Sequence, residues 1–258
     1  MTRALVFDSG VGGLSVVGEI RKRLPALGLD YAADDAFRPY GTKTETQLRD
    51  RLPRLLWDLV EMAQPDLAVV ACNTASTVAL ADIRNALSIP VVGVVPAIKP
   101  ASLQTRSGTL AVLGTPSTVR QAYVDDLIAD FAPDHDVLRH GSVALVEMGE
   151  AKLEGRTVDR AALAAEIAPI FAELDVDTVV LACTHFPLLR DELAAAAPRP
   201  VAWVDSGEAI ARRVESLLGE VRGEERPDTA FFIGDSVSEA RRAAFAKYGF
   251  GRVVALPP

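Results

Sequence analysis

The chain has little cysteine and no long apolar run. Cys72 and Cys183 are the only cysteines in 258 residues, and of the three histidines only His185 is near either one. A disulfide framework and a metal site are therefore not favoured. No apolar run approaches the roughly 18 residues of a membrane-spanning helix, and the N-terminal residues lack a signal-peptide pattern. We expect a cytoplasmic protein with reduced thiols and no membrane partner.

The chain also lacks an excess of positive charge. It has 27 Lys and Arg residues against 35 Asp and Glu residues, a formal net charge of -8. This balance gives direct nucleic-acid binding no electrostatic basis. It mildly opposes an anionic substrate, but salt screens charges beyond about 8 Å, so local donors would have to hold one. The length suits one large domain or two modest ones.

Both cysteines follow apolar runs typical of buried strands. The first run spans residues 66–72 and reads DLAVVAC, and the second spans 177–183 and reads DTVVLAC. Open α/β sheets bind ligands beyond the carboxyl ends of their strands, which places both thiols at candidate active-site positions. A thiolate can act as base or nucleophile. Core filling and a single nucleophilic cysteine are the alternatives, and the matched pair favours a joint role.

Strand and helix patterns alternate along the whole chain, which predicts parallel α/β sheets. The repeated Cys-ended strand predicts two similar units. Thr44 and Gln47 form a capping-box pattern, and Ser117 is expected to cap a helix over 118–131. A helix is expected over 77–87, a strand or loop over 142–146, and a loop over the charged run 219–228. In residues 8–13, DSGVGG opens a helix and directs backbone N–H groups at an anion.

Six segments together resemble the glutamate racemases of the cofactor-independent aspartate/glutamate racemase superfamily, along essentially the whole chain. They are VFDSGVGGLSVV (6–17), RPYGTK (38–43), ACNTAS (71–76), VVGVVPAIKPA (91–101), ACTHFPLL (182–189) and VDSGEAIA (204–211). The resemblance implies racemisation of L-glutamate and D-glutamate, supplying D-glutamate for peptidoglycan synthesis. It implies two similar lobes, each a mostly parallel sheet flanked by helices. Residues 1–96 with 205–258 would form the first and 97–204 the second, with the active site in the interlobe cleft.

Racemisation without a cofactor requires two bases on opposite faces of Cα, and two thiols fit that requirement. No segment indicates pyridoxal phosphate. The resemblance assigns Cys72 to the D-enantiomer and Cys183 to the L-enantiomer, with Asp8 near Cys72 and with Glu147 and His185 near Cys183. Glu150 is an alternative to Glu147. The substrate-binding residues that the resemblance implies are Asp8, Ser9, Tyr40, Gly41, Asn73, Thr74, Thr118, Thr184 and His185.

Other assignments stay open at this stage. A sister activity, such as aspartate or hydantoin racemisation or maleate isomerisation, is the enzymatic alternative, and binding to DNA gyrase is the alternative from another class. The acidic residue of the substrate loop is Asp34 or Asp35. The segment 149–155, GEAKLEG, resembles relatives that a peptidoglycan precursor activates. Such an activator and a homodimer are the partners that the resemblance allows besides glutamate.

Overall fold

The structure, a computed structural model, describes residues 2–223 and 226–258. Residues 224 and 225, part of the charged run expected to be a loop, lie outside the described residues. The chain divides into two compact units. Unit 1 comprises Met1–Val94 and Gly207–Pro258, and unit 2 comprises Val95–Ser206. In the described residues, no helix combines the length and the apolar character needed to cross a membrane.

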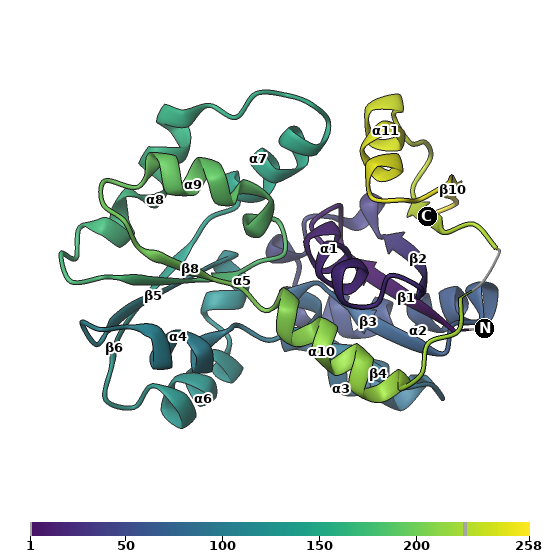
Figure 1. Cartoon of the computed structure of the whole chain (residues 1–258), viewed down its shortest axis with the longest axis horizontal. Coiled ribbons are helices and arrows are strands. Elements are labelled where there is room, and N and C mark those ends of the chain that lie inside the picture. Colours follow the sequence, from purple (N-terminus) through teal and green to yellow (C-terminus); the bar gives the residue numbers. More distant parts are fainter. Residues whose placement is uncertain (1, 224–225) are drawn as a thin grey trace. The chain divides into compact units, whose positions relative to one another are not determined.

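Unit 1 contains a six-stranded sheet in the order β10-β9-β2-β1-β3-β4 (Figure 1). All of its strand pairs are parallel, and in the register of β1 and β3 Phe7 lies opposite Val70. The strands are β1 (Arg3–Asp8), β2 (Gly28–Ala33), β3 (Leu67–Val70), β4 (Val91–Gly93), β9 (Thr229–Ile233) and β10 (Arg252–Leu256). The buried strands read as apolar runs because helices cover both faces of such a sheet.

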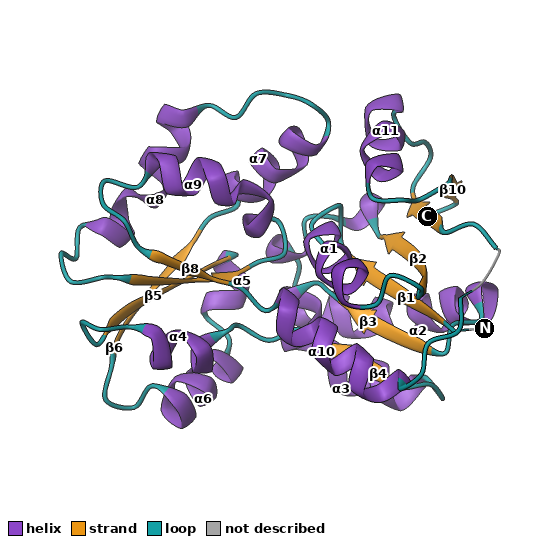
Figure 2. Ribbon diagram, viewed as in Figure 1, coloured by secondary structure: helices purple, strands orange, loops and turns teal. Residues whose placement is uncertain are grey.

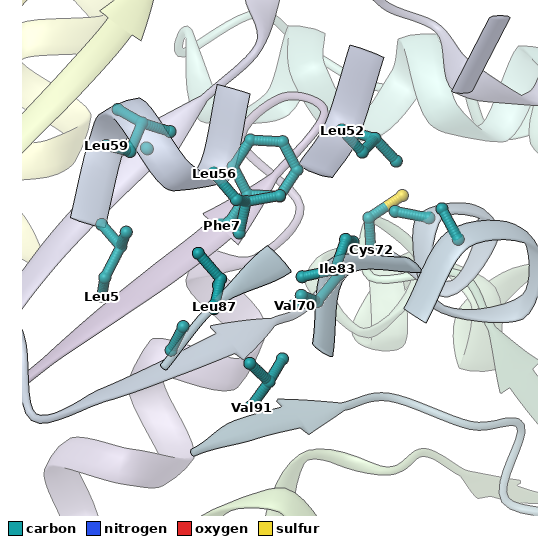
Figure 3. Close-up of a cluster of buried hydrophobic side chains, with 14 of the residues drawn as sticks. Leu5, Phe7, Leu52, Leu56, Leu59, Val70, Cys72, Ile83, Leu87 and Val91 are labelled. Atoms are coloured by element: carbon teal, nitrogen blue, oxygen red, sulfur yellow. The ribbon is translucent and has the colours of Figure 1, made fainter. Parts of the chain in front are cut away.

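The helical elements of unit 1 flank this sheet (Figure 2). They are α1 (Leu14–Arg23), η1 (Asp35–Phe37), η2 (Tyr40–Thr42), α2 (Glu45–Ala63), α3 (Asn73–Ala86), α10 (Gly207–Leu218) and α11 (Glu239–Lys247). Leucines of α2 and apolar residues of α3 pack on Leu5, Phe7 and Val70, and Cys72 belongs to the same buried cluster (Figure 3). On α11, Phe245 packs edge-to-face on Tyr31 and on Phe232.

Unit 2 contains a four-stranded parallel sheet in the order β6-β5-β7-β8. Its strands are β5 (Thr109–Gly114), β6 (Asp136–Gly141), β7 (Thr178–Ala182) and β8 (Ala202–Val204). Its helices are α4 (Ile98–Gln104), α5 (Pro116–Val119), α6 (Ala122–Phe131), α7 (Ala144–Leu153), α8 (Arg160–Phe171), η3 (Phe186–Leu189) and α9 (Arg190–Ala196). One face packs on α7, α8, η3 and α9, and the other on α4, α5 and α6. The predicted class, two parallel sheets flanked by helices, is confirmed.

The capping box of Thr44 and Gln47 is also confirmed, with both reciprocal hydrogen bonds formed at the start of α2.

Three local predictions are wrong. The helix after Cys72 begins at Asn73 rather than at residue 77, because the Cys72 carbonyl already accepts a hydrogen bond from the Ser76 amide, with N and O 2.9 Å apart. A polar tripeptide after a strand can form the first helical turn as readily as a loop.

The expected helix 118–131 is two helices, α5 and α6, and its N-cap is Thr115 rather than Ser117. Pro116 at the first helical position fixes that start, since its missing N–H is not needed there. The segment 142–146, expected as strand or loop, leads into α7. The Ser142 hydroxyl accepts from the Leu145 amide at 3.1 Å and supports the first turn of this helix.

Candidate active site

The two cysteines lie at equivalent positions of their sheets. Cys72 follows β3, and β3 neighbours β1 on the side opposite to β2; Cys183 follows β7, and β7 neighbours β5 on the side opposite to β6. The strand order reverses between β1 and β3 and again between β5 and β7. These are topological switch points, where open α/β sheets bind ligands beyond the carboxyl strand ends. Each unit therefore places one thiol where its own topology favours a binding site.

In unit 1 the thiol stands at the start of a helix. Cys72 is the N-cap residue of the 14-residue α3 and is 6% exposed. Its thiol donates to the Ser9 hydroxyl, with Sγ and Oγ 3.8 Å apart. Figure 3 shows the side chain at the margin of the apolar cluster, near Leu52. A helix N-terminus stabilises negative charge, so the dipole of α3 favours a negatively charged group at this position.

Asp8 ends β1 and is fully buried. Its Oδ1 accepts a hydrogen bond from the Gly10 amide at 2.8 Å, and the Gly10 carbonyl accepts one from the Tyr31 hydroxyl at 2.8 Å. A Cβ on Gly13 would lie 2.8 Å from the Tyr31 hydroxyl oxygen and 3.0 Å from the Asp8 Cβ. Gly13 thus allows the start of α1 to approach Asp8 and Tyr31 closely.

Asn73 and Thr74 form the first turn of α3, and both are buried. The side-chain oxygen Oδ1 of Asn73 is buried and has no hydrogen-bond partner among the described residues. Buried polar atoms are nearly always paired, so an unpaired acceptor beside Cys72 marks a place for a donor that the protein does not supply.

Tyr40 and Gly41 lie in η2, close to α3. The Tyr40 ring is buried, and its hydroxyl donates to the Asp34 carboxylate at 2.6 Å. Burial and the neighbouring Asp34 carboxylate raise the pKa of the Tyr40 phenol well above its usual range. The phenol therefore stays neutral and acts as a donor.

The two candidate acids of the substrate loop are both in ion pairs. Asp34 binds Arg51 through both carboxylate oxygens, while Asp35 Oδ1 binds Arg38 and Arg241, each at 2.6 Å. Both carboxylates thus serve the packing of the loop on its neighbours.

In unit 2 the thiol stands beside a buried imidazole. Cys183 Sγ lies 3.8 Å from His185 Nδ1, and His185 Nε2 lies 2.8 Å from Glu150 Oε1. Cys183 is 6% exposed, His185 3% and Glu150 2%. Burial alone would lower the pKa of His185, but its hydrogen bonds with Cys183 and Glu150 raise that pKa well above the usual value. The three side chains form a line along which Glu150 holds the imidazole against the thiol.

Of the two acids that the sequence left open as the partner near Cys183, one contacts His185. Glu150, the alternative, makes the contact, whereas Glu147 is exposed one turn earlier on α7. Gly149 permits the close approach, because a Cβ there would lie 3.0 Å from the His185 Cβ. The sequence pattern predicted no helix over this segment, so it could not distinguish which of two acids three residues apart faces the imidazole.

Two threonines of the predicted site lie in unit 2. Thr118 is fully buried in α5, where its amide donates to the Thr115 hydroxyl at 3.2 Å. Thr184 is buried between Cys183 and His185.

Metal sites and cavities are two other features that can mark a functional site. The described residues contain no group of three or more His, Cys, Asp or Glu side chains that could hold a metal ion. A cavity of about 630 Å³ in unit 1 has none of the predicted site residues in its lining, which includes Phe37, Arg51, Arg54 and Ile233.

The chain as a whole is similar to known proteins. The model of the family described as Asp/Glu/hydantoin racemase matches residues 12–214. The chain belongs to this family. Its relatives include the glutamate racemase of Sphingopyxis alaskensis, which is 50% identical over 96% of this chain and 95% of the relative. The glutamate racemase of Shewanella sp. is 46% identical over 95% of this chain and 93% of the relative.

A solved structure matches the fold closely. The Escherichia coli glutamate racemase, crystallised with L-glutamate and the activator UDP-MurNAc-ala, superposes with a TM-score of 0.94 at 43% identity. That match covers 99% of this chain and 98% of the other. The family predicted from the sequence motifs is thereby confirmed.

Proposed function

We propose that the chain is a cofactor-independent isomerase that interconverts L-glutamate and D-glutamate, with Cys72 and Cys183 as its two bases. The observation that carries the proposal is the pair of thiols, each buried just beyond the carboxyl end of an inner strand at a switch point. The similarity to the glutamate racemases named above, which are up to 50% identical to this chain, supports glutamate as the substrate. We further propose that the lobe of residues 1–96 with 205–258 and the lobe of 97–204 each contribute one of these thiols to the same glutamate molecule.

In the proposed reaction one cysteine, as thiolate, takes the α-proton. The Cα–H bond breaks, an S–H bond forms, and the electron pair is left on Cα and its carboxylate. The other cysteine, as thiol, gives its proton to the opposite face of Cα and becomes the thiolate, so the two exchange roles in the reverse direction. Cys72 acts on D-glutamate and Cys183 on L-glutamate.

The neighbours of each thiol prepare it for this exchange. The N-terminus of α3 stabilises the Cys72 thiolate, and Ser9 and Asp8 lie at the end of the adjacent strand. On the other side a protonated His185, held by Glu150, stabilises the Cys183 thiolate. We also propose Glu147 as a second acid near Cys183, since its exposed carboxylate lies on α7, the helix that carries Glu150.

Neutral groups would bind the substrate. The unpaired Oδ1 of Asn73 is an acceptor suited to the α-ammonium group of glutamate. Hydroxyl and backbone donors would hold the two carboxylates, because several convergent donors in a site with little water can balance an anion. The groups proposed for this role belong to Ser9, Tyr40, Gly41, Thr74, Thr118, Thr184 and His185.

The test is racemisation of single enantiomers followed by circular dichroism, with aspartate and hydantoin substrates as a panel. We expect turnover of L-glutamate and D-glutamate without added cofactor. In deuterated solvent, newly formed product should carry deuterium on Cα in both directions, because the thiol that delivers the proton is not the one that removed it. A preference for another substrate of the panel, or product without deuterium, would contradict the proposal.

We also propose a cytoplasmic setting, because both bases must remain reduced, and neither cysteine forms a disulfide in the structure. The product would supply peptidoglycan synthesis.

A peptidoglycan precursor is the proposed activator, since the similar E. coli enzyme was crystallised with UDP-MurNAc-ala as activator. Adding this nucleotide to the assay should raise kcat/KM; an unchanged value would remove activation from the proposal. A homodimer is the proposed assembly, and light scattering would measure it.

A further inference from the structure

A buried ion pair in unit 1, between Asp34 and Arg51, contacts Tyr40 of the proposed substrate loop. The Asp34 carboxylate is 0% exposed and accepts three hydrogen bonds, from Tyr40 Oη at 2.6 Å and from Arg51 Nε and Nη2 at 2.7 Å each. The Asp34 amide donates to the Asp8 carbonyl at 3.1 Å. Asp34 therefore connects three elements: the end of β1, the loop that carries Tyr40, and helix α2.

We propose that Arg51 is a positioning residue for substrate binding, which acts through Asp34 to fix Tyr40 and the Tyr40–Gly41 backbone beside Cys72. The inference deepens the proposed function and rests on it, since it assigns the Tyr40–Gly41 loop to glutamate. Arg51 touches neither substrate nor thiol in this scheme. Its guanidinium supplies the charge and the bidentate geometry that allow a carboxylate to stay buried under the loop.

The first reason is the charge of Asp34. A buried carboxylate is stable only when it is paired and hydrogen-bonded, and Arg51 supplies two of its three hydrogen bonds. Without the guanidinium, the carboxylate loses two of its three hydrogen bonds and must shift toward another donor or toward water. Either change alters the short hydrogen bond that holds the Tyr40 ring.

The second reason is that the loop stacks on the same guanidinium. Arg51 lies over the Phe37 ring, 4.9 Å from its centroid, and Phe37 packs edge-to-face on Tyr40 with ring centroids 6.2 Å apart. Lys43 lies over the same ring at 4.6 Å. Arg51 thus reaches Tyr40 by two routes, through the Asp34 carboxylate and through the Phe37 ring.

The third reason is the position of Tyr40 next to the chemistry. The η2 turn contacts α3, the helix that begins at Asn73 and has Cys72 as its N-cap. Tyr40 and Cys72 also belong to the same cluster of buried side chains. A displaced η2 would therefore disturb the pocket for glutamate while leaving the thiols on their strands.

Arg51 can be reached from solvent, which allows a chemical test. Its side chain is 28% exposed and lines the 630 Å³ cavity together with Phe37, Arg54 and Leu55. In an Arg51→Ala protein a small guanidinium ion could enter this cavity and occupy the vacated place beside Asp34.

The experiment compares Arg51→Ala with Arg51→Lys and with Arg49→Ala. Arg49 is the matched control, because it lies on the same helix and makes an exposed ion pair with Asp82 on α3. We expect Arg51→Ala to raise KM for glutamate about tenfold or more with kcat within about threefold, as the loss of a charged hydrogen bond predicts. Arg51→Lys should fall between this variant and the wild type, and Arg49→Ala should match the wild type.

Millimolar guanidinium chloride should lower the KM of Arg51→Ala toward the wild-type value, whereas ammonium chloride should not. An unchanged KM in Arg51→Ala, a fall in kcat alone, or no response to guanidinium would overturn the inference. If Arg51→Ala does not fold, Tyr40→Phe replaces it. This change removes only the hydroxyl that binds Asp34, and a wild-type KM in that variant would also overturn the inference.

Hydrogen exchange separates this inference from the proposed function. Exchange of the amides in residues 37–43 should be faster in Arg51→Ala than in the wild type and should slow again with guanidinium, whatever substrate the enzyme uses. If the wild type does not racemise glutamate while the exchange responds as expected, the function is wrong and the anchoring of the loop stands. If glutamate is racemised while exchange and KM stay unchanged in Arg51→Ala, the function stands and the anchoring is wrong.

Discussion

Replacing Glu150 with Gln tests the line of side chains behind Cys183 more directly than any other change. Glu150 Oε1 and His185 Nε2 are 2.8 Å apart, and both side chains are almost fully buried. Gln has nearly the same shape and can still accept a hydrogen bond from a neutral imidazole, but it has no negative charge. The substitution therefore removes the charge that helps to keep His185 protonated, with little change in packing.

The size of the effect follows from the kind of hydrogen bond lost. A bond to a charged group contributes about 1.5–3 kcal/mol and a neutral one about 0.5–1.5 kcal/mol, so the free energy of unfolding should fall by about 1–2 kcal/mol. For a chain of this length, that change lowers Tm by about 2–8 °C. Conversion of L-glutamate should slow by about tenfold or more, because the Cys183 thiolate loses its cationic partner.

The pH dependence has a definite sign. The pKa of His185 is raised in the folded protein above its value in the unfolded chain, near 6.5. The stability that this shift contributes is fully present below that unfolded pKa and is lost as the pH rises through the raised folded pKa. The difference in Tm between wild type and Glu150→Gln should therefore be largest near pH 6 and should shrink in alkaline solution.

Thermal unfolding between pH 6 and 9 and initial rates from each enantiomer measure these effects. Glu147→Gln is the matched control for stability, since Glu147 is an exposed acid on the same helix and such changes alter stability by about 0.5 kcal/mol or less. A larger loss of Tm in Glu147→Gln than in Glu150→Gln would refute the pairing of His185 with Glu150. So would a Tm difference that grows as the pH rises.

Three further predictions follow from single contacts. Replacing either Cys72 or Cys183 with Ser should abolish racemisation in both directions while glutamate still binds by calorimetry, because each turnover needs both groups; near-normal turnover in one variant would favour a single nucleophilic cysteine. Gly13→Ala should lower the free energy of unfolding by about 1–3 kcal/mol in urea titrations, since its Cβ would lie 2.8 Å from the Tyr31 hydroxyl, and an unchanged midpoint would show that α1 can shift. Desolvation opposes the charge of Asp177, but hydrogen bonds that the Thr105 hydroxyl and nearby amides donate to the carboxylate outweigh it and lower the pKa of Asp177 to about 2. The stability that this carboxylate contributes is present above pH 3.8 and is lost as the pH falls toward 2. Asp177→Asn should therefore flatten the acid limb of the curve of Tm against pH, and a curve parallel to that of the wild type would contradict this.

The sequence by itself determined the local elements that carry the chemistry. Apolar runs ending at Cys72 and Cys183 predicted buried strands with thiols at their carboxyl ends, and the glycines after Asp8 predicted the strand–loop–helix junction. These features depend on residues close together in the chain, so periodicity and turn residues are enough to reveal them. The motifs around them were also specific enough to identify the family.

Only the tertiary structure decided which side chains meet. Strand order shows that β3 and β7 lie at switch points, and no local pattern contains the order in which parallel strands pair. The contact of Glu150 with His185 depends on the rotation of α7 against η3, and the binding of Asp34 by Arg51 joins residues 17 positions apart. Such contacts arise when helices pack on a sheet and buried charges find partners, and the packing that sets them is a property of the whole unit.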